Sequence, residues 1–150
     1  MRTHVEFVSS DFSPYTGEEE EINPSRFGKR LAEFLAQQLP AHGFSVTGVG
    51  VEDWGVRVDL DNPDHPLWIG CGNYEEFENG FLCFIDPSTP FVRKWFKKFP
   101  TAPTVERLAV AIETILQSSG KVSNIRWWSE KLSPPLTLRS SGTAQKRAAP

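Results

Sequence analysis

Four apolar stretches between residues 44 and 85 set what this chain can fold into. The first two alternate as half-buried strands do, and the last two are short, largely apolar runs. In the second stretch Trp54, Val56, Val58 and Leu60 share one face of the expected strand. Turn residues separate the stretches, and Asn79-Gly80 suits a tight hairpin connection. Glycines in the first stretch indicate a bulge. Four consecutive strands with short connections predict an antiparallel meander. The stretches are 44–51, 54–60, 67–71 and 81–85.

Helical spacing of apolar residues appears on both sides of this meander. Asn23 and Pro24 have the residue types of a helix cap and a first helical position, and they predict a helix over 24–39. A second helix is expected over 103–118, with Gly120 as its stop. The aromatic residues of 91–99 also recur at helical spacing, with cations between them, and this pattern predicts a short amphipathic helix.

The full pattern predicts an α+β fold in which an antiparallel sheet of four to six strands packs on two main helices. Residues 4–10 and 122–128 add a first and a last strand, so the expected order is β-α-β-β-β-β-α-α-β. The segment from Asp11 to Glu21 is expected to be a loop. Residues 1–132 are expected to form one domain, and 133–150 a disordered basic tail that lacks acidic residues.

Composition agrees with a globular domain, since 39% of the 150 residues are hydrophobic and 23% are charged. Uninterrupted apolar runs reach only four or five residues, which excludes a membrane-spanning helix. The first residues, MRTHVEF, do not have the apolar core of a signal peptide, so we expect a cytoplasmic protein. We expect Cys71 and Cys83 to be buried free thiols, because structural disulfides are rare in the cytosol. A disulfide would require their strands to be neighbours in matching register.

Charge is distributed unevenly along the chain although the net charge is only -3. Residues 1–90 carry 16 acidic and 5 basic side chains, whereas residues 91–150 carry 3 acidic and 11 basic ones. If the fold keeps these groups apart, the acidic side attracts a basic partner and repels nucleic acid.

Residues with catalytic or metal-binding chemistry do not form a recognisable site. The three histidines and two cysteines lack the close spacing with which zinc sites usually begin, so we expect no metal and no cofactor. Cys71 lies between two glycines, but a cysteine nucleophile needs a nearby base and a lowered pKa. A small hydrolase or transferase that uses Cys71 or the acidic loops is therefore an alternative, and a non-enzymatic protein is preferred.

Acidic residues and aromatic rings adjoin several expected turns, which is typical of protein-recognition surfaces. A loop of four glutamates precedes the first helix, and further carboxylates follow the first and third strands of the meander. These residues make up the predicted binding surface: Glu18, Glu19, Glu20, Glu21, Glu52, Asp53, Trp54, Glu75 and Glu76.

The basic stretch 91–99 supports a second alternative, a nucleic-acid accessory protein. Lys94, Lys97 and Lys98 alternate with aromatic residues, as in proteins that bind single strands. The overall pI of about 5.6 makes nucleic acid an unlikely main partner.

The chain resembles a family of small uncharacterised bacterial α+β proteins. The resemblance lies in GEEEEINPSRFGKRLAEFL, EDWGV, WIGCGN and VSNIRWW, and it covers roughly residues 4–130. It implies no activity, cofactor or site residue. The order of elements and the charge are also similar to those of small immunity proteins, which cover a toxin with an acidic face.

From these observations we expect a cytosolic, non-enzymatic protein-binding domain that acts by occlusion, as an immunity-type inhibitor does. Its partner is expected to be a protein with a basic surface, with no membrane involved. The sequence leaves the oligomeric state open.

Overall fold

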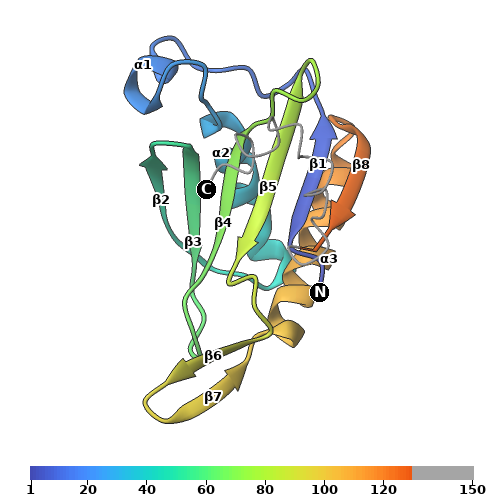
Figure 1. Ribbon diagram of the computed structural model, residues 1–150. Helices are drawn as coiled ribbons and strands as arrows, with labels where there is room; N and C mark the ends of the chain where they lie inside the picture. The colour runs from blue at the N-terminus through green and yellow to red at the C-terminus, as the bar shows by residue number, and fades with distance from the viewer. Residues whose placement is uncertain (130–150) are drawn as a thin grey trace, which may run out of the picture.

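A computed structural model describes residues 1–129 and has the expected α+β architecture. A six-stranded antiparallel sheet is covered on one face by helices, and a separate two-stranded hairpin projects from one end (Figure 1). The six strands of the main sheet are β1 (His4–Val8), β2 (Val46–Glu52), β3 (Gly55–Leu60), β4 (Leu67–Asn73), β5 (Gly80–Asp86) and β8 (Ser123–Trp128). The hairpin consists of β6 (Phe91–Lys94) and β7 (Lys97–Pro100).

The second layer consists of α2 (Lys29–Gln38), the short 3-10 helix η1 (Leu39–His42) and α3 (Ala102–Ser119). The short helix α1 (Glu18–Ile22) lies beyond the strand ends (Figure 1). Gly120 follows α3 in the left-handed region with φ 72°, which confirms the predicted stop. None of the helices in the described part of the chain is both long and apolar enough to cross a lipid bilayer. The predicted tail over 133–150 lies outside the described residues.

The sheet order is β2-β3-β4-β5-β1-β8, so the predicted four-strand meander is confirmed. The N-terminal strand β1 adds beside β5, and β8 forms the edge next to β1. The register between β2 and β3 shifts between Val46 and Gly48, which agrees with the predicted bulge. The β4–β5 connection spans 74–79 and is longer than the predicted tight turn. Asn79 has φ 58° as predicted, but Gly80 is the first residue of β5 and does not have a positive φ.

Apolar side chains on one sheet face meet α2 and α3 in a single core. The period of two along strands and of 3.6 along helices brings these residues to the same interior. The fully buried side chains include Val5, Phe7, Val56, Val58, Ile69, Ile85, Leu31, Leu35, Leu108, Ile112 and Leu116. Trp127 packs against this core and its neighbour Trp128 lies on the other sheet face, as expected for adjacent strand residues.

The start of the first long helix differs from the prediction. The helix begins at Lys29 rather than at residue 24, and the expected glutamate loop instead contains the short helix α1. Residues 23–28 form a tight turn in which Ser25 has φ 68°. The local cap signal of Asn23-Pro24 was overridden because the backbone of this turn bonds to the end of β4.

The predicted helix over 91–99 is wrong, and these residues form the β6–β7 hairpin. A short run of aromatic residues between prolines fits either a helix or a strand, because so few residues do not distinguish the helical period of 3.6 from the strand period of two. Pro90 and Pro100 bound the segment, so a helix there could reach only about two turns. Aromatic residues also favour strands.

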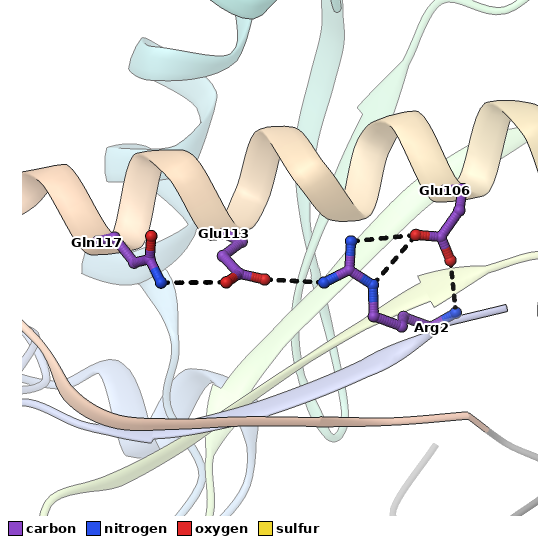
Figure 2. A network of polar contacts seen from close by, with 4 residues as sticks. All are labelled: Arg2, Glu106, Glu113 and Gln117. Carbon is purple, nitrogen blue, oxygen red and sulfur yellow. Dashed lines mark hydrogen bonds and ion pairs between the residues drawn. The ribbon is translucent and has the colours of Figure 1, made fainter.

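The N-terminus is tied to α3 by Arg2, which lies between two acidic side chains (Figure 2). Its guanidinium contacts Glu106 at 3.0 Å and Glu113 at 2.8 Å, and its backbone nitrogen donates to Glu106 at 3.0 Å. Gln117 donates to Glu113 one turn further along the helix. Burial alone would raise the pKa of Glu106, but the hydrogen bonds and charge of Arg2 lower it overall. These contacts hold the start of the chain, which leads into β1, against α3.

Three backbone segments approach one another closely around Cys71-Gly72 of β4. A Cβ atom on Gly28 would lie 2.4 Å from the carbonyl oxygen of Cys71 and 3.1 Å from the Cα of Gly72. A Cβ atom on Gly55 would meet the same oxygen at 2.4 Å. The glycines of this region therefore serve backbone packing, which joins the start of α2 and the β2–β3 turn to β4.

Replacing Gly28 by alanine should therefore destabilise the fold by about 1–3 kcal/mol, because the new methyl group overlaps backbone that cannot rotate away. Gly28 has φ 178°, so the effect is steric and not conformational strain. Gly50→Ala is the matched control, since nothing lies within 4 Å of a Cβ there, and it should change stability by less than about 0.5 kcal/mol. Urea unfolding followed by circular dichroism measures both. Equal stability of the two variants would refute the close approach.

Candidate functional site

Three acidic segments meet at one end of the main sheet. These are α1, the β2–β3 turn and the β4–β5 connection, and Figure 1 shows all three beyond the same strand ends. The Asn23 side chain donates to the backbone oxygen of Asp53, which joins the end of α1 to the β2–β3 turn. The predicted acidic residues are thus brought to a common region, which we call the acidic end.

Asn73, the last residue of β4, fixes this region to the sheet. Its side-chain amide donates to the Ser25 carbonyl at 2.9 Å and accepts from the Phe27 nitrogen at 3.1 Å. Its backbone nitrogen donates to the Phe27 carbonyl at 2.8 Å. The turn that follows α1 and the start of the β4–β5 connection are therefore held together by three hydrogen bonds.

The carboxylates of the acidic end differ in how available they are. Glu21 pairs with Lys29 at 3.2 Å, and Glu52 lies 3.8 Å from Arg57. Glu19 and Glu52 are half-buried. The fully exposed predicted residues are Glu20, Glu21, Asp53, Glu75 and Glu76, and Glu78 adds an exposed carboxylate that the prediction did not include.

Glu18 was predicted to belong to this surface, but its side chain is buried and only 2% exposed. Its carboxylate accepts hydrogen bonds from the backbone nitrogens of Gly28 at 2.8 Å and Lys29 at 2.7 Å, at the start of α2. It also accepts from the Tyr15 nitrogen at 2.9 Å. Glu18 therefore caps the helix from a distance of ten residues, because unpaired N–H groups and the helix dipole favour a carboxylate there.

Trp54 also differs in role from the prediction. Its ring does not stand out among the acidic loops but packs on the outer sheet face, 6.0 Å from the ring of Trp68 and 5.1 Å from that of Phe84. The exposed aromatic residue of the acidic end is instead Phe77, which is 41% exposed and packs edge-on against Tyr74 at 5.8 Å.

A pocket of about 410 Å³ opens at this end between the β4–β5 connection and the segment that follows β1. Glu75 and Glu76 line it together with Phe77, whereas the predicted residues of α1 and the β2–β3 turn do not. The pocket therefore includes only part of the predicted surface. Its walls combine carboxylates with aromatic rings, which suits a cationic group carrying an apolar stem.

The outer face of the sheet carries an aromatic cluster that sequence reasoning missed. Phe84 lies over Gly70 on the neighbouring strand, so a Cβ atom there would meet its ring at 2.2 Å. The sequence could have indicated this cluster. Side chains of a strand alternate between the two sheet faces, so the aromatic residues at the non-core positions of β1, β4, β5 and β8 must face outward. The cluster consists of His4, Trp54, Trp68, Phe84 and Trp128.

His4 lies in this cluster between two rings, with centroids 5.8 Å from Phe84 and 5.5 Å from Trp128. Burial of the imidazole lowers the pKa of His4 to about 4, because the surrounding rings disfavour the charged form. The Thr3 hydroxyl lies 2.9 Å from His4 Nδ1. His4 is therefore neutral at pH 7 and serves as a packing residue of the outer face.

Cys71 and Cys83 lie directly opposite each other on neighbouring strands, and both are buried free thiols as predicted. Their register meets the condition for a disulfide, but the two thiols are reduced. Hydrogen bonding to Cys83 and burial raise the pKa of Cys71 well above its usual value. The structure thus gives Cys71 neither access to a substrate nor the lowered pKa that a nucleophile needs.

His65 was one of the few soft ligands in the sequence, and it is buried at the β3–β4 connection. Its Nδ1 lies 2.8 Å from the carbonyl oxygen of Pro66. Across residues 1–129, no group of three or more His, Cys, Asp or Glu side chains is placed to hold a metal ion.

No protein-family model, curated protein or solved structure matches this chain. The resemblances to a bacterial family and to immunity proteins are not tested by these comparisons and stay predictions.

Substitution of Glu18 should destabilise the fold, whereas substitution of an exposed glutamate in the same helix should change the stability little. Glu18→Ala leaves three backbone N–H groups without their acceptor and should cost about 2 kcal/mol. Glu20→Ala, an exposed residue of the same helix, should stay within about 0.5 kcal/mol of the wild type. Chemical denaturation at pH 7 measures the difference, and equal losses in both variants would contradict the capping role.

Acid should destabilise the protein partly through His4. The folded pKa of about 4 lies below the ordinary 6.5, so the unfolded chain binds a proton that the folded chain does not. The stability contributed by neutral His4 is therefore complete above pH 6.5 and is lost as the pH falls toward 4, by about 2.5 kcal/mol at pH 4.5. His4→Phe keeps a stacked ring without this titration.

The free energy of unfolding of both proteins at pH 7.5 and pH 4.5 tests this. The variant should gain about 2.5 kcal/mol relative to the wild type between the two pH values. The carboxyl groups are common to both proteins and cancel in the comparison. If the free energies of unfolding of variant and wild type differ by the same amount at both pH values, burial does not depress the His4 pKa.

Proposed function

We propose that this chain is a non-enzymatic, cytosolic protein-binding domain that captures a partner with a basic surface at its acidic end. The observation that carries the proposal is the convergence of α1, the β2–β3 turn and the β4–β5 connection on one end of the sheet. Three segments that are distant in the sequence thereby present one surface of like charge.

Binding there would combine two physical effects. Exposed carboxylates such as Glu20, Asp53 and Glu75 make the local electrostatic potential more negative and steer a basic partner over roughly a Debye length of 8 Å. Phe77 and the adjacent pocket supply the apolar area that a stable contact requires. By covering the partner's basic surface the domain would block it, as an immunity-type inhibitor does.

A small hydrolase that uses Cys71 is the less favoured alternative, because this thiol is buried and its pKa is raised. The acidic loops could still serve a hydrolase only if two carboxyl groups had distinct pKa values and a shared substrate site. Binding therefore remains the function that this geometry supports best.

Charge reversal tests the proposal with a matched pair of variants. Asp53→Lys/Glu75→Lys changes two exposed residues of two different acidic segments, whereas Asp61→Lys/Asp64→Lys makes the same net change in the β3–β4 connection at the opposite end. Partners captured by wild-type protein from its own cells at low salt are identified, purified and titrated with each variant. The first pair should lower the affinity at least tenfold, and the control pair by less than threefold.

Loss of affinity that is equal in the two double variants would indicate a general charge effect and not a site. A purified partner that binds the Asp53→Lys/Glu75→Lys protein as tightly as wild type would contradict the proposal directly.

A further inference from the structure

The β6–β7 hairpin ends in two large aromatic residues that the protein leaves in water. Trp95 is 86% exposed and Phe96 is 96% exposed, and they form the two-residue loop between Lys94 and Lys97. Figure 1 shows the hairpin projecting from the end of the sheet opposite α1. Exposed rings of this size at a projecting tip are typical of a surface that becomes buried in a partner.

The conformation of this loop is unfavourable for the residue that occupies it. Trp95 has φ 63°, a left-handed value that two-residue hairpin loops usually assign to glycine or asparagine. A bulky residue at positive φ is uncommon and costs free energy. The fold itself does not require a ring there, because the ring packs on little of the protein.

Four cations lie directly behind the tip. Lys94 pairs across the strands with Lys97, and Arg93 with Lys98, so like charges face each other in two successive pairs. None of the ion pairs found among residues 1–129 involves these four side chains. The segment 91–100 contains no acidic residue. Lys98 Nζ lies 4.3 Å from the centroid of the Phe91 ring, and an anionic partner would relieve the remaining repulsion.

The base of the hairpin is firmly attached. The Thr101 nitrogen donates to the Pro90 carbonyl at 2.9 Å, and its hydroxyl donates to the carbonyl of Thr89. Thr101 is fully buried, and α3 begins at the next residue. The tip is therefore presented by rigid elements and not by a long loop.

We propose that this hairpin is a peripheral membrane contact, in which Trp95 and Phe96 enter the interface of an anionic phospholipid bilayer. Tryptophan and phenylalanine rings are favoured at the boundary between headgroups and acyl chains. The two cation pairs lie one and two residues behind the rings, or about 3–7 Å, which is the depth of the lipid phosphates. This proposal replaces the expectation of no membrane, which considered only spanning segments.

A bilayer fits the hairpin better than a single-stranded nucleic acid does. Proteins that bind single strands use a groove of cations and several stacking rings along the strand, whereas this hairpin has two rings at its very end and cations on both faces. The hairpin follows β5, which ends at Asp86, and the β3–β4 connection with Asp61 and Asp64 lies at the same end of the sheet (Figure 1), so a strand extending from the tip onto the domain would approach carboxylates. A bilayer at the tip stays about 13 Å from the hairpin base, beyond the screening length of about 8 Å.

Flotation of the full chain with lipid vesicles tests the proposal. Vesicles of phosphatidylcholine alone are compared with vesicles containing about 30% phosphatidylserine, a composition chosen for its surface charge. The variants are Trp95→Ser/Phe96→Ser for the tip and Lys94→Gln/Lys97→Gln for the charges. Val49→Ser/Val110→Ser and Arg26→Gln/Lys121→Gln are the controls, since they change exposed apolar residues and cations elsewhere in the protein.

Wild-type protein should bind the anionic vesicles and be released by 0.5 M salt. The tip variant should lower the partition coefficient at least tenfold, and the charge variant roughly thirtyfold at low salt, while the controls stay within threefold. Because all four changed hairpin side chains are exposed, both variants should remain folded, which circular dichroism checks.

Absence of vesicle binding by the wild type, or equal binding by the tip variant, would overturn the proposal. A single-stranded oligonucleotide that binds more tightly than the vesicles, and is lost in the tip variant, would assign the hairpin to nucleic acid instead. Neither result depends on the acidic end, so the outcome is separate from that of the protein-binding proposal.

Discussion

The junction between the start of α2 and the end of β4 is the constraint on which the arrangement of this molecule depends. Gly28 lies against the Cys71 carbonyl, and the buried Glu18 carboxylate accepts the first hydrogen bonds of the helix. Asn73 bonds to the turn before the helix from the sheet side. These contacts set the helix on the inner face of the sheet. They also fix where the remaining glutamates of α1 lie. The position of the acidic end therefore follows from the contacts that attach α2 to the sheet.

The uneven charge along the sequence becomes a difference in charge between the two ends of the molecule. The carboxylates of α1, the β2–β3 turn and the β4–β5 connection lie at one end of the sheet. The basic hairpin of residues 91–100 projects from the other end, beyond the acidic β3–β4 connection (Figure 1). An anionic surface that attracts the hairpin also repels the acidic end, and the molecule is thereby oriented with α1 away from that surface. The two proposed contacts are compatible in this orientation, because a protein bound at the acidic end would not compete with lipid at the hairpin tip.

The long-range pattern of the sequence was sufficient to predict the meander and both long helices, but it did not predict the register that places the two cysteines opposite each other. It failed where a local pattern fits two structures. Asn23-Pro24 resembles a helix start, but the tertiary bonds of Asn73 hold those residues in a turn. Glu18 is one of four identical residues, and no local signal distinguishes the buried cap from its exposed neighbours. The spacing of 91–99 fits a helix, and only the pairing of its two halves reveals a hairpin.

The departures from local rules differ in what they imply for function. The buried carboxylate of Glu18 and the glycines around Cys71 are unusual residues at their positions, yet contacts within the fold account for each of them. Trp95 in a left-handed conformation and two like-charged cross-strand pairs are also unfavourable. Among residues 1–129, the contact of Lys98 with the Phe91 ring offsets only part of this cost. A sequence that specifies its fold consistently tolerates such conflicts where something outside the fold compensates. The hairpin is therefore the part of the molecule whose residues are best explained by a partner. Its two aromatic rings lie ahead of four cations, an arrangement that fits an anionic surface with an apolar layer beneath it.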